Sequence, residues 1–207
     1  MQAALIETVA IALAAYALGS VSFAVVVSKL MALPDPRSYG SNNPGATNVL
    51  RTGSKLAAAL TLIGDAGKGA LAVGLTVLYT GESPASGFDA PLAGAMAFLG
   101  HLYPVFHGFK GGKGVATAAG VLLALNLYLG LGTLATFGII VFFFRMISLA
   151  SIISAVFAVF WAWSLFGLAP ITPIVGAIAL LLIWRHRENI VRLLGGSEPR
   201  LGEKKTP

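Results

Sequence analysis

The sequence contains no cysteine, and only 11% of its residues are charged. Without cysteine there is no disulfide framework, no thiolate nucleophile and no cysteine-based metal site. No Lys or Arg precedes the first apolar run, which also exceeds the core of about 7–15 residues in a secretory signal, so we expect this run to remain as a span. A continuous basic face is missing too. Because the net charge of +6 is scattered between apolar runs, we expect no nucleic-acid partner.

Apolar residues are abundant instead. They make up 57% of the 207 residues, against roughly 45–50% in ordinary globular domains, and the mean hydropathy is +0.84. Runs at 3–27, 56–79 and 149–168 reach or approach the ~20 residues that a helix needs to cross about 30 Å of hydrocarbon. The sequence therefore predicts an all-α, polytopic integral membrane protein with a single transmembrane domain over residues 1–207.

The positions of the charges predict the topology, because cytoplasmic loops are rich in Lys and Arg. The loop at 34–55, the loop around 110–113 and the segment from 185 onward are basic, whereas 81–91 carries only acidic charges. The stretch 115–144 fits one long helix or a hairpin broken near 126–132, and only the hairpin keeps Arg145 and the C-terminus on the basic side.

We therefore predict seven transmembrane helices, with the N-terminus outside and the C-terminus cytoplasmic. The last residues, from about 199 to 207, should form a flexible tail. The expected spans lie near 3–27, 56–79, 91–106, within 115–144 as two helices, 149–166 and 170–184.

The first polar segment, residues 39–51, reads YGSNNPGATNVLR, a composition typical of turns. Its small residues expose backbone N–H groups. Ser41, Thr47 and Asn48 add neutral hydrogen-bonding groups, and Arg51 offers a planar fork suited to phosphate. Together these residues would form a phosphate cradle. A solvated connecting loop is the alternative interpretation.

The second polar segment, residues 100–117, reads GHLYPVFHGFKGGKGVAT. A nucleotide-binding P-loop does not fit, because the glycine spacing is one residue short and Gly114 stands where that motif has Ser or Thr. Lys110 and Lys113 instead flank two glycines at 111–112, just before a helix whose positive N-terminal end favours an anion. Lysines that only anchor a cytoplasmic loop are the alternative interpretation.

The third polar segment, residues 185–198, reads RHRENIVRLLGGSE. On a helix, His186 and Asn189 share a face, and Arg185 and Arg192 lie on one stripe because they are seven residues apart. An anion would meet a mixed surface of Arg, His and Asn there. A juxtamembrane anchor for anionic lipid is the alternative interpretation.

Four further polar residues are predicted to be structural. Asp65 and Lys68 fall three residues apart inside the second span, where isolated charges are costly, so we expect them to pair with each other or with another polar group. His101 and His107 bracket a proline turn at the end of a span, where histidine is more often structural than catalytic.

The three segments together, with the D-x-x-K-G at 65–69, resemble the PlsY family of bacterial acyl-phosphate glycerol-3-phosphate acyltransferases. The motifs are G-S-x-N-x-G-A-T-N-x-x-R, G-H-x-x-P-x-F-x-x-F-K-G-G-K-x-V-A-T and R-H-x-x-N-I-x-R-L-x-x-G-x-E. The resemblance extends from residue 19 to residue 198. One departure is Asn42, where many relatives have Gly, but Asn tolerates a left-handed backbone better than most residues.

The resemblance implies seven helices in the bacterial cytoplasmic (inner) membrane and an active site at the cytoplasmic face. The implied enzyme transfers a fatty acyl group from acyl phosphate to the 1-hydroxyl of glycerol 3-phosphate. The products are lysophosphatidic acid and phosphate, an early step of phospholipid synthesis. The two substrates and membrane lipids are the expected partners, and neither a cofactor nor a metal ion is expected. A small transporter or channel for a phosphorylated metabolite is the alternative function.

The site residues are carried over by matching position. We expect Ser41, Arg51, Lys113, His186 and Asn189 to be catalytic, without a covalent enzyme intermediate. His186 could be a base for the hydroxyl or a neutral phosphate ligand, and we expect the ligand role because nearby arginines disfavour imidazolium. The expected phosphate-binding residues are Ser41, Thr47, Asn48, Arg51, Lys110, Gly111, Gly112, Lys113, His186, Asn189 and Arg192.

Overall fold

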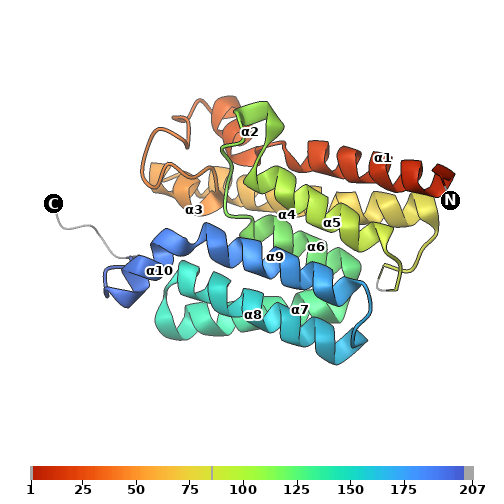
Figure 1. Ribbon diagram of the computed structural model, residues 1–207. Coiled ribbons are helices and arrows are strands. Elements are labelled where there is room, and N and C mark those ends of the chain that lie inside the picture. Colours follow the sequence, from red (N-terminus) through yellow and green to blue (C-terminus); the bar gives the residue numbers. More distant parts are fainter. Residues whose placement is uncertain (1, 85, 203–207) are drawn as a thin grey trace.

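The structure is a computed structural model that describes residues 2–84 and 86–202 (Figure 1). Every regular element within these two ranges is helical, with no strand among them, as predicted. The elements are α1 Gln2–Gly19, α2 Phe23–Leu30, α3 Ala46–Val49, η1 Leu50–Thr52, α4 Lys55–Thr80, α5 Asp89–Leu102, η2 Val105–His107, α6 Val115–Leu125, α7 Leu127–Phe144, α8 Ile147–Phe166, α9 Ile171–Arg185 and α10 Arg187–Leu194.

Among these elements, 4 helical segments are long and apolar enough to cross a membrane: Gln2–Leu30, Lys55–Thr80, Leu127–Phe144 and Ile147–Phe166. Helices α6 and α9 are apolar but shorter, and α5 has 14 residues. The spans predicted at 56–79, 149–166 and 170–184 match α4, α8 and α9 closely. The span predicted at 91–106 is shorter as a helix, because α5 ends at Leu102 and a proline turn follows.

The first apolar run is broken, although we predicted one span. Helix α1 ends at Gly19 and α2 begins only at Phe23. Ser20 lies in the break, where its hydroxyl donates to the Tyr16 carbonyl at 2.9 Å and accepts the Val105 N–H at 3.3 Å. The break therefore brings the end of α1 against the turn that follows α5.

The stretch 115–144 is two helices, as the hairpin interpretation predicted. Asn126 has an extended backbone, and its side chain accepts the N–H groups of Tyr128 and Leu129 at 3.0 and 3.1 Å. Such a cap satisfies donors that a new helix leaves unpaired at its start. Helix α7 then packs against α6, with Gly130 close to Leu123.

Small residues allow the helices to pack closely, as is common in membranes. A Cβ atom on Gly120 of α6 would collide with the backbone of Ala66 in α4, and one on Gly19 of α1 would collide with the backbone of Ala97 in α5. The central core lies among α4, α5, α6, α7, α8 and α9. Its largest members include Val73, Phe98, Leu102, Val121, Leu129, Ile171 and Val175.

Two parts of the chain bear on predictions made above. Asp65 and Lys68 pair within α4, as predicted, with 2.9 Å between Oδ1 and Nζ. Of the tail predicted to be flexible, residues 203–207 lie outside the described residues. Leu201 is held rather than free, because it donates its N–H to the Arg145 carbonyl at 2.6 Å and accepts the Arg145 guanidinium at 2.8 Å.

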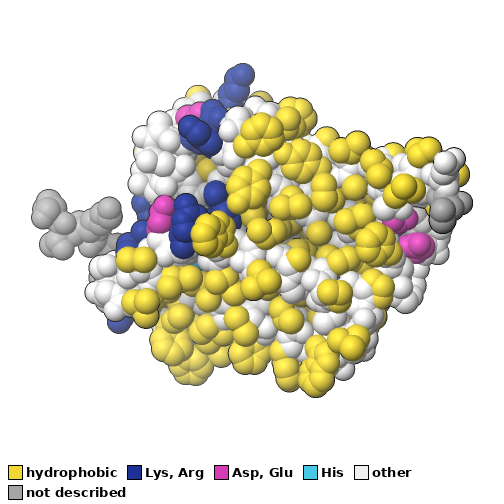
Figure 2. All heavy atoms as spheres, in the orientation of Figure 1, with side chains coloured by type: hydrophobic (Ala, Val, Ile, Leu, Met, Phe, Trp, Pro, Cys, Tyr) yellow, Lys and Arg dark blue, Asp and Glu magenta, His cyan; other side chains and the backbone are white. Residues whose placement is uncertain are grey.

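The two ends of the bundle differ in charge. Figure 2 shows Lys and Arg side chains gathered at the end that carries α2, α3 and α10, and a broad apolar surface along the helices. At the opposite end, Glu7, Glu82 and Asp89 lie around one polar pocket. This asymmetry is what the distribution of charges along the sequence indicated.

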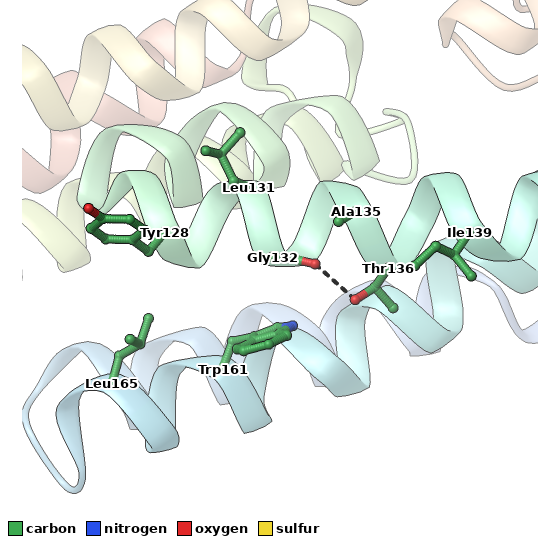
Figure 3. Close-up of a pocket in the computed structure, with 8 residues that line it drawn as sticks. All are labelled: Tyr128, Leu131, Gly132, Ala135, Thr136, Ile139, Trp161 and Leu165. Atoms are coloured by element: carbon green, nitrogen blue, oxygen red, sulfur yellow. Dashed lines mark hydrogen bonds between the residues drawn. The ribbon is translucent and has the colours of Figure 1, made fainter.

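An apolar groove of about 570 Å³ lies between α7 and α8 (Figure 3). Tyr128, Gly132 and Ile139 line it from α7, and Trp161 and Leu165 line it from α8. The groove lies along the part of α7 that follows Asn126. Helix α6, with 11 residues, rises about 16 Å between the basic loop and that turn. The groove therefore begins about this distance from the basic loop and extends along α7 as far as Ile139.

Candidate active site

Residues 111–113, which we call the strap, have no regular secondary structure and lie within the segment 108–114 that connects η2 to α6. Gly114 follows the strap with φ +84°, a left-handed conformation that favours glycine, and a Cβ there would meet the Phe98 ring. Arg185 at the end of α9 donates to the carbonyl of Gly111 at 2.8 Å and to that of Gly112 at 3.1 Å. The strap is therefore clamped to α9 by one guanidinium.

The backbone of the strap is largely occupied by internal hydrogen bonds. Both glycine carbonyls accept from Arg185, and the Gly112 N–H donates to the His101 carbonyl at 3.1 Å. We predicted that Gly111 and Gly112 bind phosphate through this backbone. The Gly112 N–H is therefore used within the protein, whereas phosphate binding by the Gly111 N–H stays a prediction, and Lys113 is the cation of the strap.

Lys113 begins a hydrogen-bonded network that reaches the C-terminal segment. Its Nζ donates to Oδ1 of Asn189 in α10. The Asn189 amide donates to Glu198 Oε1 at 2.6 Å, and Arg192 donates to Glu198 Oε2 at 2.7 Å. Lys113, Asn189 and Arg192, three of the predicted site residues, are thus joined through Glu198.

The charges in this network influence one another. Burial, followed by the positive charge of Arg192, lowers the pKa of Lys113. Burial raises the pKa of the Glu198 carboxyl, but hydrogen bonds from donors that include Asn189 and Arg192 outweigh it and lower that pKa overall. Glu198 therefore stays ionised and balances part of the positive charge that gathers around the strap.

His186 lies at the junction of α9 and α10, where the helix breaks. Because α10 starts anew at Arg187, the prediction of one helical stripe from Arg185 to Arg192 is wrong. The imidazole is only 3% exposed, and Nδ1 lies 2.8 Å from the Leu182 carbonyl. A carbonyl can only accept, so Nδ1 carries the proton and Nε2 carries the lone pair.

The imidazole is neutral at physiological pH. Burial is the main cause that lowers the pKa of His186 from 6.5 to about 4, and the Lys113 charge adds to this effect. The hydrogen bond with Leu182 opposes the decrease without overcoming it. A neutral imidazole whose Nε2 only accepts can take a hydrogen bond from a hydroxyl, but it cannot donate one to a phosphate oxygen. This tautomer therefore disagrees with the phosphate-ligand role that we expected for His186 from the sequence.

The first polar segment lies at the same end of the bundle, around α3 (Figure 1). Asn48 is buried there, and its amide donates to the carbonyls of Pro36 at 2.7 Å and Tyr39 at 3.1 Å while Oδ1 accepts the Ser41 N–H at 3.1 Å. We predicted a phosphate ligand, but this side chain is used to hold the loop. Asn42 has φ +54°, the left-handed conformation expected at this position.

The remaining predicted residues are exposed side chains at this end. Ser41, Thr47, Arg51 and Lys110 all face solvent. Within residues 2–84 and 86–202, the network of Lys113, Asn189, Glu198 and Arg192 includes none of them. The described residues likewise show no group of three His, Asp or Glu side chains placed to hold a metal ion.

The structure adds two residues that were not predicted for the site. Arg185 fixes the strap, and Glu198 fixes Asn189 and Arg192. Both belong to the third segment, and Glu198 closes its motif, so the sequence contained the signal. The contacts depend on a fold that brings residues 112 and 185 together, which sequence spacing alone does not show.

An apolar helical bundle with a lysine, an amide and a neutral imidazole gathered at its basic end defines a membrane protein suited to a phosphorylated substrate. The sequence profile described as glycerol-3-phosphate acyltransferase matches residues 9–196. The chain therefore belongs to the glycerol-3-phosphate acyltransferase family.

Individual relatives agree over nearly the full length. A glycerol-3-phosphate acyltransferase of Ralstonia nicotianae is 59% identical over 202 residues, which are 98% of both chains. One of Cupriavidus taiwanensis is 62% identical over 197 residues, 94% of this chain and 96% of the relative. A solved structure of PlsY, described as an integral membrane glycerol 3-phosphate acyltransferase in its glycerol 3-phosphate form, has a TM-score of 0.88 and 38% identity, and covers 95% of this chain and 96% of that one.

Proposed function

We propose that this protein transfers a fatty acyl group from acyl phosphate to the 1-hydroxyl of glycerol 3-phosphate, giving lysophosphatidic acid and phosphate. Glycerol-3-phosphate acyltransferase activity, and with it a place in phospholipid synthesis, follows from the family. Two solved PlsY structures, described as the glycerol 3-phosphate form and the lysophosphatidic acid form, support this acceptor and product. Acyl phosphate as the donor is the further step of the proposal.

The observation that carries the proposal is the position of Lys113. It lies two residues before the apolar helix α6, in a strap fixed by Arg185, and its ammonium group is held by Asn189 rather than extended freely into water. Both substrates carry phosphate and one also carries an acyl chain. A cation fixed at the end of an apolar helix allows the phosphate to bind while the chain remains in an apolar environment.

The chemistry needs little beyond charge neutralisation and alignment. The hydroxyl oxygen attacks the acyl carbon, the bond from that carbon to the phosphate oxygen breaks, and the hydroxyl proton leaves with the phosphate. Acyl phosphate already has a good leaving group, so no covalent enzyme intermediate is required. No cofactor is part of the proposal.

The roles follow from the contacts of each side chain. Lys113, Arg192 and the exposed groups of the first segment bind phosphate, and Asn189 orients Lys113. His186 accepts a hydrogen bond from the glycerol hydroxyl through Nε2. The full proposed set is Ser41, Thr47, Arg51, Lys110, Lys113, His186, Asn189 and Arg192, with Asn48, Gly111 and Gly112 shaping the loops that carry them.

We also propose that the protein spans the bacterial cytoplasmic membrane seven times, as a single domain with the N-terminus outside. Counting Gln2–Leu30 as one broken span, the others are α4, α5, α6, α7, α8 and α9. The gathering of Lys and Arg at one end supports a cytoplasmic active site and C-terminus, because basic loops stay inside.

The test is turnover by the purified protein in detergent micelles, with acyl phosphate and labelled glycerol 3-phosphate. We expect lysophosphatidic acid and phosphate to form in equal amounts, and Lys113→Ala to lose most of this activity. Comparable turnover with acyl-CoA would reject acyl phosphate as the specific donor. A transporter needs two compartments, so product formation in micelles excludes transport as the function, whereas uptake into vesicles without acyl transfer would replace our proposal.

A further inference from the structure

A chain of buried polar side chains connects the middle of α4 to the strap. Asp65 and Lys68 are 2% and 1% exposed, and Nζ of Lys68 also donates to the Val21 carbonyl at 2.7 Å. Nδ1 of His101, from α5, lies 3.5 Å from Oδ1 of Asp65, the oxygen that also pairs with Lys68. Charged groups within a membrane span are costly and seldom only fill space, so this group calls for a function.

The opposite edge of the His101 ring contacts the strap. A Cβ atom on Gly112 would collide with Nε2 of that ring, and it would lie 2.9 Å from Cε1 and 3.1 Å from Cδ2. Gly112 therefore lies against the Nε2 edge of the imidazole, and its N–H also donates to the His101 carbonyl at 3.1 Å. The next residue is Lys113, so the position of the ring determines the position of the Lys113 backbone.

The contacts of Gly111 are of a different kind. A Cβ there would meet the backbone oxygen of His101 and Cδ of Pro104, and not the ring. These contacts persist whatever side chain residue 101 carries. Since neither glycine has a positive φ, alanine is compatible with the backbone torsion angles at both positions, and the effect of each substitution comes from the atoms that its methyl group meets.

We propose that Asp65 and His101 are positioning residues of the acyltransferase site. Asp65 orients the imidazole through its Nδ1 edge, and Lys68 balances the charge of the carboxylate. The Nε2 edge of the ring fixes the position of Gly112, and therefore the position of the Lys113 ammonium group relative to the substrate phosphate. This inference rests on the proposed function, and it gives the buried charges of α4 a task at the basic end of the bundle.

The test is a double-mutant cycle between His101 and Gly112, measured as kcat/KM per folded enzyme. Gly112→Ala alone should lower kcat/KM by about a hundredfold, because it pushes the strap off the ring by about an ångström. His101→Ala alone should cost about tenfold through a loosened strap. The double variant should be no worse than His101→Ala, because the added methyl group then occupies the space of the missing ring.

Gly111→Ala is the matched control. It should lose activity by the same factor with and without the His101 ring, because its methyl group meets backbone. His107→Ala removes the other histidine of this loop and should leave kcat/KM unchanged. Folding is monitored by gel filtration and thermal unfolding in detergent. Should His101→Ala not yield folded protein, His101→Asn takes its place in the cycle, because Asn keeps the donor toward Asp65 and lacks the ring edge at Gly112.

The kinetic constants distinguish positioning from stability alone. His101→Ala and the charge-neutral pair Asp65→Asn with Lys68→Gln should each raise KM for the same substrate as Lys113→Ala does. Equal losses for Gly112→Ala in both backgrounds, or normal kcat/KM per folded enzyme in the His101 variant, would overturn the positioning role. A wild-type protein that makes no lysophosphatidic acid would instead refute the proposed function.

Discussion

Replacing His186 distinguishes a hydroxyl acceptor from a general base and from a phosphate ligand. The Nδ1–H is committed to the Leu182 carbonyl at 2.8 Å, so Nε2 is the atom that can face substrate. With a pKa lowered to about 4, mainly by burial, only about one imidazole in a thousand is protonated at pH 7. The ring is therefore a weak base with a permanently available lone pair.

The expected loss of activity follows from these properties. A well-matched general base contributes about 10²–10⁴-fold, but its pKa should lie near the working pH. A single neutral hydrogen bond contributes about 0.5–1.5 kcal/mol, which is about two- to tenfold in rate. We predict that His186→Ala lowers kcat/KM by about tenfold, in the range of the acceptor role.

The pH dependence provides the sharper assay. Glycerol 3-phosphate itself titrates near pH 6, but this affects both enzymes equally, so the ratio of wild-type to His186→Gln kcat/KM isolates the imidazole. We expect that ratio to be constant from about pH 5 to pH 8, since the folded imidazole titrates near 4. A ratio that falls with a midpoint near 6.5, or a loss above about a hundredfold in kcat, would refute the reasoning.

Three further outcomes are expected. Glu198→Gln should lower kcat/KM by up to about tenfold in steady-state kinetics, because it weakens the hold on Arg192, whose half-exposed charge is partly screened. Ser54→Cys should react with an impermeant thiol reagent only after permeabilisation and Ser86→Cys already in intact cells; the reverse pattern would invert the topology. The pKa of His186 is near 6.5 in the unfolded state and near 4 in the folded state, so the unfolded state binds more protons between these pH values. The free energy of unfolding, measured by thermal unfolding, should therefore fall by up to about 3 kcal/mol as the pH drops from 6.5 to 4. The decrease should be smaller in His186→Gln.

The fold class could be predicted because membrane helices follow directly from apolar length. Asn126 was within the predicted break, and its capping side chain explains why two helices form instead of one. The break at Ser20 could not be predicted, because the surrounding residues remain apolar and the polar partners of Ser20 come from tertiary contacts. Likewise, the helix break at His186 has no proline or glycine to mark it in the sequence.

The candidate site could be predicted in composition but less well in the role of each residue. Lys113 and Asn189 do meet, although 76 positions separate them. Asn48 was predicted as a phosphate ligand because amides suit that role, yet the folded loop uses its whole amide group. The choice between ligand and holder depends on which backbone groups lie nearby, and local sequence does not specify this.

The central claim is that Lys113 and His186 meet the reacting groups of the two substrates. It is tested most directly by a crystal structure with glycerol 3-phosphate and a stable phosphonate analogue of acyl phosphate both bound. We predict a phosphate or phosphonate oxygen on Lys113, and the glycerol 1-hydroxyl within about 2.6–3.2 Å of His186 Nε2. Substrates that bind elsewhere in the bundle, or a hydroxyl directed away from His186, would contradict this account.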